Sequence, residues 1–128
     1  MTIDTGKANI SLLNETDNIV LVDIYADGEL NKNNVDDIHE AINNLNTPIP
    51  IDTICVKSGK NFLSDEAFEY SMEHNSIHGK VIYVIKHMKD IHYPSKVKKT
   101  YFKEHVVDFC TSIDEAYHLL KSMVDQNI

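Results

Sequence analysis

The chain has 128 residues, which is the size of one domain and enough to bury a hydrophobic core without disulfides. Its 42% hydrophobic and 25% charged residues are ordinary for a soluble globular protein. The formal net charge is −8, and all 12 basic residues are lysine, so the overall charge and the lack of arginine both argue against nucleic-acid binding.

No segment has the pattern of a targeting or membrane-spanning sequence. The first residues lack the basic start and apolar run of a signal peptide, and no apolar stretch approaches the ~20 residues of a membrane helix. We therefore expect a cytoplasmic protein that is not integral to a membrane. Cys55 and Cys110 each lie in or at the end of an apolar run without CxxC spacing, which predicts two buried free thiols.

The first third of the chain predicts two strands and a helix. Residues 1–8 are polar and are expected to be loose, and residues 9–125 are expected to form one domain. Asn9–Leu13 and Ile19–Tyr25 are predicted strands that pair as an antiparallel hairpin. Asn34 is the expected N-cap of the first helix, whose apolar positions are Val35, Ile38, Ala41, Ile42 and Leu45, and whose first turn holds Asp36 and Asp37.

The rest of the chain alternates strands and helices with short connections. The predicted strands are Ile51–Val56, Val81–Ile85 and His105–Cys110. Helices are expected from Ser64 to about His74, from about Pro94, and after Ser112, where Ser112 and Glu115 form an S-x-x-E capping box. The order β-β-α-β-α-β-α-β-α predicts a single α/β domain.

Three stretches carry a resemblance to a known family. They are Phe62–Tyr70 (FLSDEAFEY), the Gly79–Ile85 strand and Asp108–Leu120 (DFCTSIDEAYHLL), and with the order of elements they resemble the bacterial SpoIIAA-like (STAS) family. The resemblance implies a β/α superhelix with a mixed sheet of about five strands and about four helices. It also implies a non-enzymatic regulatory role: antagonism of an anti-sigma factor, binding of a regulatory kinase, or a sensory scaffold.

The same resemblance implies a phosphorylation switch. Family antagonists carry a serine in an Asp-Ser-(Ser/Thr)-Gly stretch at the start of their second helix, and phosphorylation there adds roughly −2 charge to the contact surface. Here Ser58-Gly59 keeps the last two residue types, but Lys57 precedes them and the leading aspartate is missing. Ser58 and Ser64 are the candidate switch residues; the alternatives are a loop residue at Ser58 and a structural N-cap at Ser64.

Positive charge concentrates in residues 80–103, which hold seven lysines against one acidic residue, Asp90. Such a segment is either a solvated helix face or a surface for an acidic protein partner or an anionic membrane. The candidate partner or anion surface comprises Lys57, Lys60, Lys96, Lys98, Lys99 and Lys103.

Two further classes of function remain as alternatives. A small-ligand or lipid carrier of SEC14-like type would line its pocket with Phe62, Phe68, Tyr101 and Phe102, although a chain this short leaves little volume for such a cavity. An enzyme is the least favoured, because no nucleophile, base and oxyanion donor assemble in the sequence. The seven histidines lack zinc-site spacing, so we expect no metal and no cofactor. A homodimer is expected only because symmetric dimers are the commonest soluble oligomers.

Overall fold

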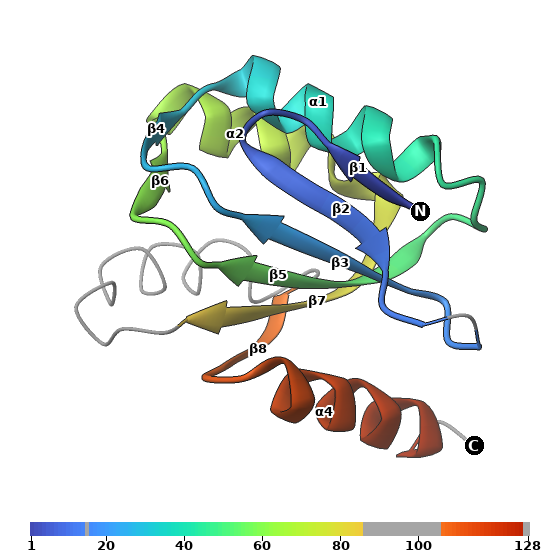
Figure 1. Ribbon diagram of the computed structural model, residues 1–128. Coiled ribbons are helices and arrows are strands. Elements are labelled where there is room, and N and C mark those ends of the chain that lie inside the picture. The colour runs from blue at the N-terminus through green and yellow to red at the C-terminus, as the bar shows by residue number, and fades with distance from the viewer. Residues whose placement is uncertain (15, 86–105, 127–128) are drawn as a thin grey trace.

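The computed structural model describes residues 1–14, 16–85 and 106–126, which form an α/β fold with helices on both faces of a mixed sheet (Figure 1). The main sheet has six strands in the order β1-β2-β3-β5-β7-β8. Their bounds are Thr2–Asp4 (β1), Ala8–Leu12 (β2), Ile19–Ile24 (β3), Ile51–Lys57 (β5), His78–Ile85 (β7) and Val106–Cys110 (β8). The predicted α/β class is confirmed, with one strand more in this sheet than expected.

The strand directions follow from the connections. β1, β2 and β3 pair antiparallel, whereas β3, β5, β7 and β8 pair parallel. Antiparallel neighbours need only a short turn, while parallel neighbours need a crossover, usually through a helix. The predicted hairpin is confirmed, with Ile10 opposite Val22. The segment that we expected to be loose contains β1, which pairs with β2 because Ile3 packs against the core beside Ile10.

A second, two-stranded sheet continues two strands of the first. β3 and β5 each stop for three residues and resume as β4 (Gly28–Leu30) and β6 (Asn61–Leu63), which pair in parallel. Neither short strand was predicted, because polar residues and glycine interrupt the apolar pattern at both places. The two interruptions lie at the same level of the fold, and this arrangement positions the site described below.

Helices α1 (Lys32–Asn43) and α2 (Asp65–Glu73) lie together on one face of the sheet (Figure 1). The predicted apolar face of α1 is confirmed, because Val35, Ala41 and Ile42 are buried and Ile38 and Leu45 are partly buried against the core. Phe68 on α2 is 5% exposed and packs with Val81.

The predicted N-cap of α1 was wrong. Asn31 caps the helix, since its side chain accepts a hydrogen bond from the Asn34 amide at 3.1 Å and its amide donates to Asn34 Oδ1 at 2.9 Å. Asn34 is therefore the third helical residue, in the partner position of a capping box. Asp36 and Asp37 consequently lie beyond the first turn.

Helix α4 (Ile113–Gln126) covers the opposite face (Figure 1). Ala116 and Leu120 are buried in a cluster with Ile54, Ile82 and other strand residues. The helix starts where predicted, and Ser112 Oγ accepts a hydrogen bond from the Glu115 amide at 3.2 Å. The Glu115 carboxylate accepts its hydrogen bond from Thr111 Oγ1, a different partner from the Ser112 amide of the predicted capping box.

The described residues hold these three α-helices and a short 3-10 turn, η1 (Asn75–Ile77). The helix expected near Pro94 lies outside them. Within the described residues, no helix combines the length and apolar character that crossing a membrane requires.

Candidate functional site

Several hydrogen bonds join the interrupted ends of β3 and β5. Ligands of parallel sheets commonly bind at the carboxyl ends of strands, and these two strands end side by side. The Gly59 amide donates to Ile24 O at 3.1 Å. A Cβ on Gly59 would lie 2.4 Å from the carbonyl oxygens of both Tyr25 and Ala26, so only glycine allows this approach of the two backbones.

Polar groups on both strands close the loop. Asn61, which is 5% exposed, donates its side-chain amide to Ile24 O at 3.1 Å and to Ala26 O at 3.0 Å. Asp27 Oδ1 accepts the Lys60 amide at 2.8 Å, and the Gly28 amide donates to Lys60 O at 2.9 Å. The loop from residue 58 to residue 60 is therefore held by hydrogen bonds to the other strand.

Ser58, the first candidate switch residue, is exposed at the start of this loop. Its hydroxyl donates to the carboxylate of Asp23, which lies near the end of β3. Side chains alternate between the two faces of a sheet, and both residues fall on the face that α4 covers elsewhere. The structure thus joins Ser58 to an aspartate 35 residues earlier, a pairing that neither local sequence indicates.

The two lysines of this region differ in their surroundings. Lys60 is exposed, as a surface residue should be. Lys57 is only 9% exposed, so the prediction that it belongs to a partner or anion surface was wrong. The alternation of β5 explains this burial, because Lys57 shares a face with Thr53 and Cys55 beneath α1 and α2.

The remaining candidates are separated from one another. Ser64 is the N-cap of α2, and its Oγ accepts the Ala67 amide at 3.0 Å. Phe62 on β6 is 50% exposed, whereas Phe68 lies in the core, so these two residues do not face one common pocket. Lys96, Lys98, Lys99, Lys103, Tyr101 and Phe102 lie outside the described residues.

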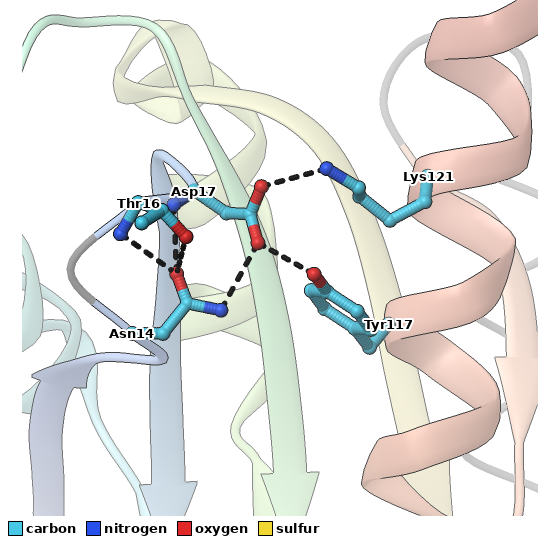
Figure 2. A network of polar contacts seen from close by, with 5 residues as sticks. All are labelled: Asn14, Thr16, Asp17, Tyr117 and Lys121. Atoms are coloured by element: carbon cyan, nitrogen blue, oxygen red, sulfur yellow. Dashed lines mark hydrogen bonds and ion pairs between the residues drawn. The ribbon is translucent and has the colours of Figure 1, made fainter.

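A second polar network, not predicted from the sequence, links the β2–β3 turn to α4 (Figure 2). The Asp17 carboxylate accepts hydrogen bonds from Asn14 Nδ2 at 3.0 Å and Tyr117 Oη at 2.6 Å, and it pairs with Lys121 Nζ at 2.7 Å. Asn14 Oδ1 also accepts the Thr16 and Asp17 amides. The only signals in the sequence were the Asn-x-x-Asp spacing of a turn and the four-residue spacing of Tyr117 and Lys121 on one helix face.

The thiols and the strand-end carboxylates of the described residues lie in different surroundings. Cys55 and Cys110 are both buried, as predicted. Burial, with a smaller effect of Asp23, raises the pKa of the Cys55 thiol to about 12, so it stays protonated. Asp52 lies near the start of β5 and accepts the Lys80 amide. Asp23 lies near the end of the neighbouring strand β3, so the two carboxylates are at opposite ends of the strand pair. Among these residues no three histidine, cysteine or carboxylate side chains are arranged to hold a metal ion.

No family model matches the chain, and comparisons with curated proteins and with solved structures find no match either.

Proposed function

We propose that the chain is a non-enzymatic regulatory protein-interaction module of SpoIIAA-like type, and that residues 58–62 form its contact surface. The observation that carries this proposal is the exposure of Phe62 beside a loop held in one conformation. Aromatic side chains are enriched in the centres of protein interfaces. A loop that is already ordered loses little conformational entropy on binding, which favours affinity.

Charge adds a second element to this surface. Lys60 places an exposed cation beside Phe62, and the hydroxyl of Ser58 is exposed two residues earlier. A partner with acidic residues around an apolar pocket is the complement of such a surface. The partner class in the proposal is therefore another protein, such as a regulatory kinase or an anti-sigma-type factor.

Regulation of this surface by phosphorylation has a physical basis at Ser58. A phosphate there replaces the hydroxyl that donates to Asp23 and adds roughly −2 charge next to that carboxylate. The resulting repulsion displaces the loop from β3. At Ser64 a phosphate instead lies at the N-terminus of α2, where negative charge is favoured and displaces no segment, so we assign the switch to Ser58. The carrier alternative gains no support, since Phe62 and Phe68 lie apart.

The test is site-specific photo-crosslinking in cells of the source organism. A benzophenone amino acid replaces Phe62 in one variant and Leu12, which is 37% exposed at the far end of β2, in the matched control. We expect one discrete adduct from position 62 and none from position 12. The purified adduct partner is then titrated against the wild-type chain, Phe62→Ser and Ser58→Asp, and we expect both substitutions to weaken binding at least about tenfold, as loss of an interface anchor does.

Two outcomes contradict the proposal. One is that position 62 gives no adduct, or the same adducts as position 12. The other is that the partner binds the wild-type chain and Phe62→Ser with equal affinity. An adduct joining two copies of this chain would make the surface a homodimer interface instead.

A further inference from the structure

Three histidines lie near the junction of α1, α2 and the sheet: His39 and His78 are partly buried, whereas His74 is exposed. His39 on α1 contacts His78 at the start of β7, edge to face, with ring centroids 5.4 Å apart and an interplanar angle of 71°. His74 follows α2 as its C-cap and stacks on Tyr70, with centroids 4.1 Å apart. Tyr70 in turn donates its hydroxyl to Asp36 on α1. The histidines therefore lie where α1, α2 and the sheet come together.

Hydrogen bonds hold two of the three rings, those of His78 and His74. Thr53 is 2% exposed, and its hydroxyl donates to Ile51 O at 3.3 Å. Thr53 Oγ1 also lies 2.7 Å from His78 Nδ1, and this hydrogen bond holds the His78 ring against β5. His74 Nδ1 lies 2.9 Å from Tyr70 O, an acceptor, and therefore donates to it.

The charged groups that act on His39 come from two elements. On its own helix, Asp36 lies one turn earlier and favours the protonated ring; from the end of α2, His74 disfavours it. β7 contributes the His78 ring, and β5 contributes the uncharged Thr53 hydroxyl behind that ring. Burial is the largest influence, and together with His74 it lowers the pKa of His39 below its ordinary value of 6.5.

We propose that His39, His74 and His78 make the α1–α2 layer sensitive to acid, so that it loosens from the sheet as the pH falls below neutrality. A neutral ring at His39 is compatible with its partly buried site, whereas a protonated ring there is desolvated, lies against the His78 ring and is disfavoured by His74. Asp36, the carboxylate acting on His39, already accepts the Tyr70 hydroxyl. This acid response is a property of the folded chain and does not depend on the proposed contact surface.

The direction of the effect follows from proton linkage. The pKa of His39 is lower in the folded chain than in the unfolded chain, so the unfolded chain binds more protons as the pH falls. The stabilisation is fully present above 6.5, the ordinary value, and is lost as the pH falls from there through the lowered folded value.

The test measures backbone hydrogen exchange on the intact chain at pH about 7.5 and about 5.5, a range in which histidine is the main side chain to titrate. We expect the protection factors of the α1 and α2 amides to fall several-fold at the lower pH, while those of α4 change little. His39→Gln should abolish most of this fall. The matched control is His118→Gln, since His118 is an exposed histidine on α4, and it should behave like the wild-type chain.

A second measurement keeps the proposal testable if His39→Gln does not fold. An NMR titration of the imidazole signals of the wild-type chain should give His39 a pKa below 6.5, and His118 serves as the exposed reference. Titration of His39 at or above 6.5 overturns the proposal. So does an equal fall in protection for α4 and for α1 and α2, or a His39→Gln variant whose acid response matches that of the wild-type chain.

Discussion

The Tyr117 hydroxyl donates to the Asp17 carboxylate at 2.6 Å, joining positions that are 100 residues apart in the chain (Figure 2). Lys121, one helical turn further on, pairs with the same carboxylate. The two contacts attach α4 to the β2–β3 turn, at the edge of the hydrophobic cluster that α4 shares with the sheet. Asp17 is therefore the residue through which the turn and the C-terminal helix stabilise each other.

We expect Asp17→Asn to remove the part of the acid sensitivity that this network supplies. The hydrogen bonds from Lys121, Tyr117 and Asn14 lower the pKa of Asp17 from 3.8 to about 2. A lowered pKa stabilises the folded chain above 3.8, and the stabilisation is lost as the pH falls from 3.8 to about 2. Urea unfolding should show wild type more stable than Asp17→Asn at neutral pH, with the difference shrinking below pH 3.8. A constant difference at every pH would contradict the role of the carboxylate.

Leu120→Ala should destabilise the chain by about 2–5 kcal/mol, the usual range for truncating a buried leucine. Leu120 is 1% exposed in the cluster beneath α4, so its removal leaves a cavity that the sheet cannot close. The matched control is Leu12→Ala, because Leu12 is 37% exposed and should cost less than about 0.5 kcal/mol. Denaturant unfolding at neutral pH measures both; similar values for the two would show that α4 is not packed as described.

Gly59→Ala tests the close approach of the two interrupted strands. The new methyl group would meet two backbone carbonyls at 2.4 Å, neither of which can rotate away, and we expect a loss of about 1–3 kcal/mol, as for overpacked sites. Gly28→Ala is the control for backbone strain without a clash. Gly28 has φ +95° and nothing within 4 Å of a Cβ, so the stability lost on this substitution comes from the backbone conformation alone. Only Gly59→Ala should also perturb the amide NMR signals of Tyr25 and Ala26.

Ser64→Ala should cost about 1 kcal/mol, because it leaves the Ala67 amide at the start of α2 without its capping oxygen. Ser64→Asp keeps an acceptor at the N-cap and should retain the wild-type unfolding midpoint. Thermal unfolding of the three proteins distinguishes a capping role from a regulatory one. If Ser64→Ala and wild type were equally stable, the hydrogen bond from the Ala67 amide to Ser64 would not stabilise α2, which would contradict the capping role.

Cys55 should not react with thiol reagents in the folded chain. Its side chain is buried and the pKa of its thiol is raised to about 12, so the reactive thiolate is scarce at neutral pH. Alkylation of this residue, followed by peptide mass spectrometry, should proceed only at the rate of opening or unfolding. Fast labelling of Cys55 at neutral pH, without denaturant, would contradict the burial of β5.

Local patterns were sufficient for most of the elements. The period-2 and period-3.6 repeats of apolar residues identified β2, β3, β5, β7, α1, α2 and α4, and S-x-x-E located the start of α4. The cap of α1 was misplaced because Asn31 and Asn34 are both good cap residues, and only the reciprocal hydrogen bonds distinguish them. β1, β4 and β6 are three residues each, too short for a periodic signal.

The sequence by itself thus determined the α/β class, the order of the main elements and the burial of both cysteines, because hydrophobic periodicity is a local property of the chain. Only the tertiary structure decided which polar residues meet. The contacts of Asp23 with Ser58, of Asp17 with Lys121 and of His39 with His78 depend on strand register and on the face that each helix covers. Lys57 became buried for the same reason: its position in β5, and not its charge, sets the face on which it lies.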